Sequence, residues 1–381
     1  MPTNTARGRR LYVLWAAALA LLLALGLVCW LVVVPYLQVR SELQRLRTDD
    51  TGAYDVLERL GGPREAARKL ELYLKMPSSL SEDSECALFL LVRCCKEPRA
   101  ADALISAALH RDPDKRAPAT LALVNLGEKG LPTLLNALND PNFKVRLEAL
   151  DALRLLAGGK TVRVPVHPLL KVLEDPDPTV RWEALNAVGA IGPEARPALG
   201  HVLKAMQDTT KANDAYYCYM ILGMPGMRVG EVRMAAVEAL GKLNAPEAIG
   251  PMIGALSDPD ADMRACAAKS FGDVRLEVPQ AGRALLAALN DGSPSVRCYA
   301  AVSLATIRPR PEGTVAVLTK LLGDSEPGVQ VGAAYALGIV GSDARDALPR
   351  LKAIAARGNK HLAPAAADAM KKITASRGKR P

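Results

Sequence analysis

The chain has 381 residues, half of them apolar and 23% charged, which excludes an intrinsically disordered protein. Aromatic residues make up only 4%, so close-packed helices are favoured over β-sandwiches. Most of the net charge of +9 lies at the two ends of the chain, in three arginines before residue 11 and five basic residues after residue 370, which argues against a nucleic-acid-binding groove on a folded surface.

A basic tail, residues 1–10, precedes a predicted transmembrane helix at residues 11–34. This run contains no charged residue, and as a helix it would span about 36 Å, more than the hydrocarbon core of a bilayer. It is longer than the apolar core of a signal peptide, and no cleavage site made of small residues follows it. An uncleaved, single-pass anchor is therefore predicted. The arginines in the tail favour a cytoplasmic N-terminus, with the rest of the protein on the non-cytoplasmic side.

Residues 35–111 are predicted to form divergent helical repeats, on hydrophobic pattern alone. Residues 112–374 repeat a clear motif about every 33 residues, as in DPNFKVRLEALDAL (140–153), DPDPTVRWEALNAV (175–188) and DGSPSVRCYAAVSL (291–304). The residue before the arginine serves as a marker for each repeat. Small residues lie four and seven positions after it, and apolar residues lie five, eight and eleven positions after it, on one helical face. The pattern predicts an all-α fold, in which each repeat contributes two amphipathic helices to an α-solenoid.

The D-P-x-x-x-V-R-x-x-A motif resembles that of HEAT repeats, particularly the short variety of phycobilisome-lyase-like proteins. The resemblance implies a right-handed α–α superhelix. It also implies a structural ladder of charge-assisted hydrogen bonds between successive repeats, formed by Asp140, Arg146, Asp175, Arg181, Asp258, Arg264, Asp291 and Arg297. The sequence departs from the pattern at three places. Gln330 replaces the arginine, Met227 stands where the aspartate before Arg233 is expected, and the last copy has Ala363.

One gap between markers is longer than the others, which predicts an insertion at about 208–228. The insertion is rich in side chains that are favoured at adaptable binding surfaces, including Tyr216, Tyr217, Tyr219 and Met220. Two alternatives remain open for it. The segment either fills a small core of its own or presents a binding loop outside the stack.

A second candidate surface is the concave face, if the marker helices line it as they do in HEAT proteins. Positions two and six after each marker would form its stripe, with Leu147 and Asp151 in one repeat and Trp182, Met234 and Tyr335 in later ones. Trp182 and Met234 are the kind of side chains that anchor interfaces. The alternative is that the stripe only contacts adjacent helices.

No catalytic, cofactor-binding or metal-ligating constellation is predicted. The four histidines are far apart, and no C-x-x-C, H-E-x-x-H or Walker A motif is present. The leading hypothesis is a membrane-anchored HEAT-repeat scaffold without enzymatic activity, which binds a protein partner through the concave face and the insertion. The alternatives are a lyase-like enzyme helper and a lipid- or nucleic-acid-binding role for the basic tails, of which the C-terminal one is residues 375–381.

Overall fold

The computed structural model describes residues 31, 33–48, 53–75, 81–93, 98–110, 113–160, 162–211, 231–356 and 361–375. Among these residues the only β-structure consists of two isolated bridges, Lys211 with Glu231 and Glu277 with Arg308. The prediction of an all-α chain is therefore confirmed.

None of the helices that the structure describes combines the length and the apolar character needed to cross a bilayer. The predicted span at 11–34 lies outside the described residues, apart from Leu31, Val33 and Val34. The tail at 1–10 lies outside them as well, and so does the C-terminal tail from residue 376 onward.

The chain divides into two compact units between Leu156 and Ala157. The α-helices that begin in the first unit are α2 (Val34–Thr48), α3 (Ala53–Arg59), α4 (Pro63–Lys75), α5 (Ser81–Arg93), α6 (Pro98–Ala108), α7 (Pro113–Ala122), α8 (Leu131–Ala137) and α9 (Phe143–Gly159), with a 3₁₀ segment at Leu123–Lys129. Within this unit α4 packs against α2 and α6, and α5 packs against α7. Alternate helices are thus neighbours, as stacked helix pairs require.

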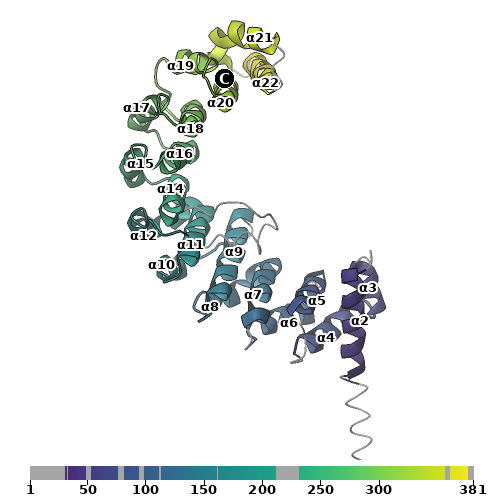
Figure 1. Ribbon diagram of the computed structural model, residues 1–381. Helices are drawn as coiled ribbons and strands as arrows, with labels where there is room; N and C mark the ends of the chain where they lie inside the picture. Colours follow the sequence, from purple (N-terminus) through teal and green to yellow (C-terminus); the bar gives the residue numbers. More distant parts are fainter. Residues whose placement is uncertain are drawn as a thin grey trace, which may run out of the picture. The chain divides into compact units, whose positions relative to one another are not determined.

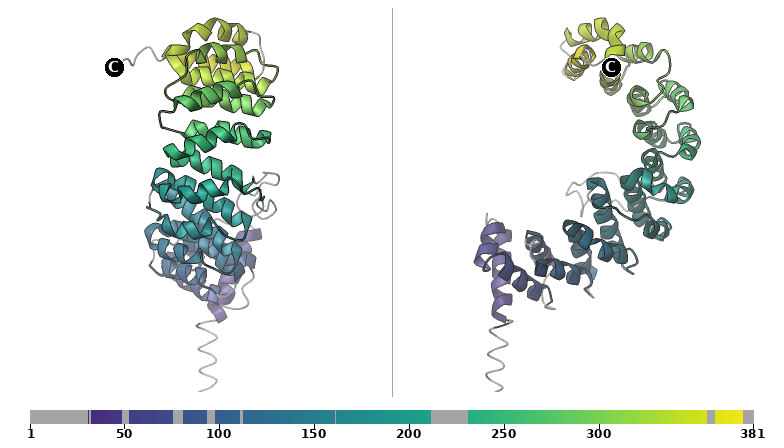
Figure 2. Two further views of the ribbon diagram at one scale, coloured as in Figure 1. Left: turned by 90° about the vertical axis from the view of Figure 1, so that its left-hand side faces the viewer. Right: turned by 180° about the vertical axis from the view of Figure 1, so that it is seen from behind.

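The second unit forms two layers of helices (Figures 1 and 2). One layer holds the A helices, α10 (His167–Val172), α12 (Leu199–Ala205), α15 (Ile249–Ala255), α17 (Pro279–Ala288), α19 (Thr314–Leu321) and α21 (Leu348–Ala356). The other holds the B helices, α11 (Pro178–Ile191), α14 (Val232–Leu243), α16 (Ala261–Ser270), α18 (Pro294–Thr306), α20 (Pro327–Val340) and α22 (Leu362–Ala375). Short 3₁₀ segments at Gly192–Ala198, Pro246–Ala248, Phe271–Asp273 and Gly341–Ala347 follow four of the B helices.

Each B helix packs against the next one along the chain, from α11 through α22. The alanines four positions after the marker are all fully buried: Ala184, Ala236, Ala267, Ala300, Ala333 and Ala366. A methyl group is the largest side chain that leaves helix backbones close together, which explains the alanine at this position in every repeat.

The residues at the helix ends cap the helices in the way that their side chains favour. The side chain of Asp177 accepts hydrogen bonds from the main-chain N–H groups of Thr179 and Val180, which caps the start of α11. Asn244 adopts the left-handed conformation directly after α14, which releases the chain from the helix and turns it toward the next A helix.

Candidate protein-interaction surface

In the second unit, each ladder arginine lies in the first turn of a B helix and joins that repeat to the next one. Nη1 of Arg264 donates to the main-chain carbonyl of Asp258 in its own repeat, at 2.9 Å. Its Nε and Nη2 donate to the carboxylate of Asp291 in the next repeat, at 2.7 and 2.9 Å. Oδ1 of Asp291 also accepts the main-chain N–H of Ser293, at 2.8 Å. The aspartate and arginine six positions apart, such as Asp258 and Arg264, are thus joined through the main-chain carbonyl of the aspartate. The carboxylate instead pairs with the arginine of the preceding repeat, as that of Asp291 pairs with Arg264.

The same arrangement recurs along the chain. The guanidinium–carboxylate pairs are Arg116 with Asp140 in the first unit, and Arg181 with Asp208, Arg233 with Asp258, Arg264 with Asp291, and Arg297 with Asp324 in the second. Arg146 donates to the main-chain carbonyl of Asp140, and Oδ1 of Asp175 accepts the N–H of Asp177. Hydrogen bonds from Arg264 and Arg297, respectively, lower the pKa of Asp291 and of Asp324. Such charge-assisted bonds fix the register of one repeat on the next.

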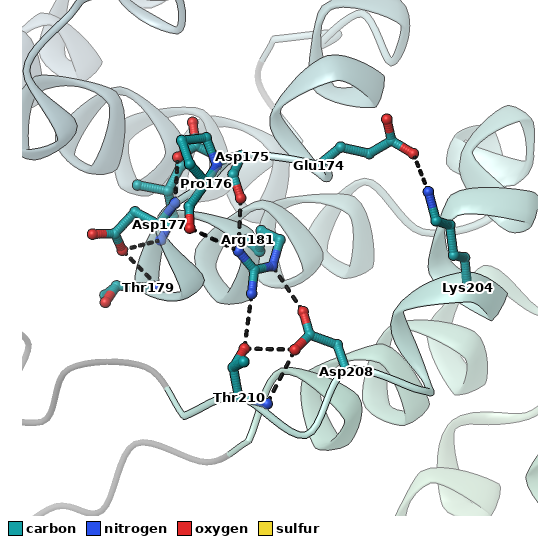
Figure 3. A network of polar contacts seen from close by, with 10 residues as sticks. Glu174, Asp175, Pro176, Asp177, Thr179, Arg181, Lys204, Asp208 and Thr210 are labelled. Carbon is teal, nitrogen blue, oxygen red and sulfur yellow. Dashed lines mark hydrogen bonds and ion pairs between the residues drawn. The ribbon is translucent and has the colours of Figure 1, made fainter.

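In the repeat that carries the insertion, Asp208 holds the position of the ladder aspartate (Figure 3). Its Oδ2 accepts from Nε of Arg181 at 2.8 Å, and its main-chain carbonyl accepts the N–H of Arg233 at 3.0 Å. Thr210 accepts from Nη2 of Arg181 and donates to Oδ1 of Asp208, at 2.8 and 2.5 Å. Burial raises the pKa of Asp208, but the bonds from Thr210 and Arg181 outweigh it and leave that pKa lowered.

This geometry corrects the expected place of the ladder aspartate. The fixed spacing points to Met227, which lies outside the described residues, whereas the contacts are made by Asp208 before the inserted segment. Lys211 and Glu231 then form an antiparallel bridge, so the chain leaves and re-enters the repeat at adjacent points. The segment between them, which includes the predicted binding residues Tyr216, Tyr217, Tyr219 and Met220, lies outside the described residues.

The ladder changes at its C-terminal end. Nε2 of Gln330 donates to the main-chain carbonyl of Asp324 at 2.6 Å, which reproduces the contact that an arginine makes within its own repeat. In the part of the chain that the structure describes, no carboxylate of a following repeat pairs with Gln330. The methyl side chain of Ala363 can make neither contact.

The predicted stripe on the marker helices is only partly exposed. Tyr335 is 50% exposed, whereas Trp182 and Met234 are half-buried. Leu147 and Asp151 on α9 are buried, which corrects their assignment to an accessible surface. The carboxylate of Asp151 is satisfied within its own helix by an ion pair with Arg154. In α9 these two positions therefore belong to the packed interior.

The accessible surface of the B helices centres on Glu238, Lys269, Tyr299, Tyr335 and Lys372, which we call the B-helix strip. Nζ of Lys269 on α16 contacts Oε1 of Glu238 on α14 at 2.8 Å, and this hydrogen bond raises the pKa of Lys269. The ammonium group of Lys372 on α22 lies over the ring of Tyr335 on α20, 5.3 Å from its centroid. The strip thus combines aromatic rings with charged groups across five successive helices.

Tyr299 was missed by the reading of the sequence. It is 41% exposed and lies three positions after its marker, outside the two positions expected to form the stripe. Equivalent positions in the two preceding repeats hold Ala235 and Cys266. A large aromatic residue in a position that holds small side chains in the neighbouring repeats is the signal that could have identified it.

The two cysteines beside the strip are poorly suited to nucleophilic chemistry. Burial raises the pKa of the Cys266 thiol to about 12 and also raises the pKa of Cys298. Because the thiolate is the reactive form, these groups react slowly at neutral pH. Among the described residues, no cluster of histidine, cysteine, aspartate and glutamate side chains could hold a metal ion.

Three importin-β structures resemble the fold. One, of importin-β in an ammonium sulfate condition, matches with a TM-score of 0.57 at 14% identity, over 87% of this chain and 50% of that chain. Yeast importin-β (Kap95p) matches with a TM-score of 0.56 at 12% identity, over 87% and 52%. A structure of Kap95p with RanGDP matches with a TM-score of 0.52 at 14% identity, over 87% and 51%. The chain spans about half the length of these proteins, and the likeness shows the fold alone.

No curated protein matches the sequence. The family model for HEAT repeats matches residues 131–215, 230–281 and 282–371, which is more than half of the chain. Together with the paired helices and the arginine–aspartate contacts between repeats, this match shows that the chain belongs to the HEAT-repeat family.

Proposed function

We propose that the protein is a membrane-anchored scaffold that binds a protein partner through the B-helix strip and the segment around 208–228. The observation that carries this proposal is the exposure of Tyr299 and Tyr335 on neighbouring helices. They are the only large apolar side chains among the described residues of the second unit that are more than about 40% exposed. Tyrosines of this kind anchor protein interfaces because they combine a large apolar ring with a polar end.

Two further observations support a protein partner. Kap95p, whose fold resembles this one, binds RanGDP, so a solenoid of this kind can present a protein-binding surface. The charges of the strip also have both signs, with Glu238 beside Lys269, which suits a mixed protein surface better than a polyanion. The lyase-like alternative rests only on the resemblance of the repeat motif to that of phycobilisome-lyase-like proteins.

The anchor is the second part of the proposal. Residues 11–34 form a run without charged residues that is long enough to cross a bilayer, and basic residues flank it on both sides. We expect the N-terminus on the cytoplasmic side and the solenoid on the other side. Such an anchor confines any complex formed on the strip to the membrane.

The strip is tested by affinity purification of tagged full-length protein from solubilised membranes. Wild type is compared with Tyr299→Ser/Tyr335→Ser and with the control Arg283→Ser/Lys352→Ser, which changes exposed residues of two A helices. We expect a stoichiometric protein that is retained by wild type and the control, and at least about tenfold depleted in the tyrosine variant, since two interface anchors contribute more than 1.4 kcal/mol. Equal recovery with all three proteins would contradict the role of the strip.

The segment around 208–228 needs a separate variant. Removing residues from 208 onward would delete the ladder partner of Arg181 and disturb the stack. Because Lys211 and Glu231 are already bridge partners, residues 212–230 can be replaced by a short glycine-rich turn that leaves Asp208 and Thr210 in place. Loss of the partner with this variant, without loss of thermal stability, is the expected result if the segment binds. Unchanged recovery would assign binding to the strip alone.

A further inference from the structure

The first helix of the solenoid begins where the predicted membrane span ends. Helix α2 starts at Val34, and Tyr36 is already buried two residues later. Val39 and Leu43 continue this buried face, and the ring of Tyr36 stacks on Tyr73 of α4 with a centroid distance of 5.0 Å. No stretch of chain is therefore available as a flexible linker between the apolar run and the first repeat.

The same end of α2 carries exposed apolar side chains. Leu31, Val33, Val34 and Leu37 are between 38% and 54% exposed, and they follow directly on the apolar sequence of residues 11–30. In water this much contiguous apolar surface is unfavourable. The predicted membrane span lies immediately before these side chains in the chain. Lipid is therefore the environment that suits them.

The character of the surface changes within one helical turn. Gln38, one turn after Val34, accepts from Nζ of Lys69 at 2.9 Å and donates to the main-chain carbonyl of Arg59 at 3.2 Å. Lys69 also donates to the carbonyl of Leu60, and no carboxylate pairs with it in the described part of the chain. Arg40 is exposed one turn after Leu37. The guanidinium of Arg59 shares the buried Glu42 with Arg45, so one of these two positive charges is not neutralised.

An apolar end followed within one turn by unneutralised basic groups is the profile of a membrane–water interface. Acyl chains solvate the apolar side chains, and the phosphate groups of lipid headgroups, which are present on both sides of a membrane, attract lysine and arginine. We propose that the start of α2 and the adjoining turn between α3 and α4 lie against the bilayer surface, with Leu37 in the acyl boundary and Arg40, Arg59 and Lys69 at headgroup level. This inference rests on the membrane anchor of the proposed function, and it adds that the solenoid is docked on the membrane rather than tethered to it.

The test uses full-length protein that carries a photoreactive benzoylphenylalanine at position 37 or, as a control, at position 109. Leu37 and Leu109 are matched in exposure, at 54% and 58%. Leu109 follows α6, and α4 packs against both α2 and α6. After reconstitution into phosphatidylcholine vesicles that contain phosphatidylserine and a tagged phospholipid, we expect at least tenfold more lipid adduct at position 37 than at position 109.

Carbonate extraction of the same membranes separates the two levels of the proposal. If the protein resists extraction but position 37 gives no more adduct than position 109, the docked arrangement is wrong and the anchor stands. If carbonate releases the protein, the anchor itself is wrong.

The variant Arg40→Gln tests the headgroup contact. We expect it to lower the ratio of phosphatidylserine to phosphatidylcholine recovered with the protein, whereas Arg283→Gln leaves this ratio unchanged. An unchanged ratio with Arg40→Gln would overturn the headgroup contact.

Discussion

In the second unit, a methyl group added at most glycines of the B helices would crowd a neighbouring B helix, with Gly328 at the start of α20 as the exception, whereas at several A-helix glycines it would meet open space. A Cβ at Gly241 of α14 would lie 2.5 Å from the main-chain oxygen of Ser270 on α16, and one at Gly338 would lie 3.3 Å from Cα of Ala369. At Gly200, Gly250 and Gly254 of α12 and α15, no atom lies within 4 Å. The difference identifies the B helices as the closely packed row, whose spacing is set by small residues.

The A helices of this unit are held differently. Gly282 of α17 also has a close neighbour, but that neighbour is Pro311 in a loop rather than a helix backbone. Helices α12 and α15 contain only seven residues each, too few to be stable alone. They therefore depend on the B helices beneath them. The B row sets the geometry of the stack, and the same row carries the strip proposed to bind a partner.

The largest expected effect comes from filling a B-helix glycine. Gly241→Ala forces α14 and α16 apart, because the obstacle is backbone rather than a flexible side chain, and it should cost about 1–3 kcal/mol. Gly254→Ala should instead stabilise α15 by up to about 1 kcal/mol through its higher helix propensity. Hydrogen exchange of peptides from α14 to α16 measures both changes locally. Similar effects at the two sites would contradict the difference between the layers.

A smaller effect is expected from the ladder, which offers a natural control at its last position. Arg297→Gln reproduces the arrangement of Gln330. It keeps a donor for the carbonyl of Asp291 but leaves the carboxylate of Asp324 without its guanidinium partner. We expect a loss of about 1–2 kcal/mol, since the pair is charge-assisted and nearly buried.

The reverse change supplies the matched variant. Gln330→Arg gains no carboxylate partner from the described residues, so its stability should change by less than about 0.5 kcal/mol. Thermal melts of the two variants compare them directly. A large gain from Gln330→Arg would mean that the ladder continues beyond α20.

The smallest effect at neutral pH is expected from protonation of the ladder, because the carboxylates are ionised in both the folded and the unfolded state. The pKa values of Asp208, Asp291 and Asp324 are lowered in the folded protein. Their contribution to stability is therefore complete above the unfolded value, about 4, and is lost as the pH falls below it toward the folded pKa. Asp291→Asn should flatten the fall in melting temperature in this acidic range, and an unchanged slope would exclude the ladder as its source.

Much of the fold could be predicted because the local sequence of each repeat contains the signals for its helices and their packing. The apolar spacing specifies the helix and its buried face, together with the alanine four positions after the marker. The D-P-x-x-x-V-R motif specifies the junction with the next repeat. Asp208 could not be predicted as a ladder residue, because the inserted segment breaks the fixed distance to Arg233 on which the pattern depends. Tyr299 was missed for another reason. Exposure varies from repeat to repeat along the B helices, and one idealised stripe does not describe it.

The claim that the B helices carry the partner-binding surface is tested most directly by photocrosslinking in native membranes. Benzoylphenylalanine replaces Tyr299 or Tyr335 on the B helices or, as a control, Lys352 on the A helix α21, each in the full-length protein. We expect a discrete protein adduct of the same mass at positions 299 and 335 and none at position 352. An adduct at position 352 alone, or no protein adduct at either tyrosine position while the protein remains in the membrane fraction, would contradict it.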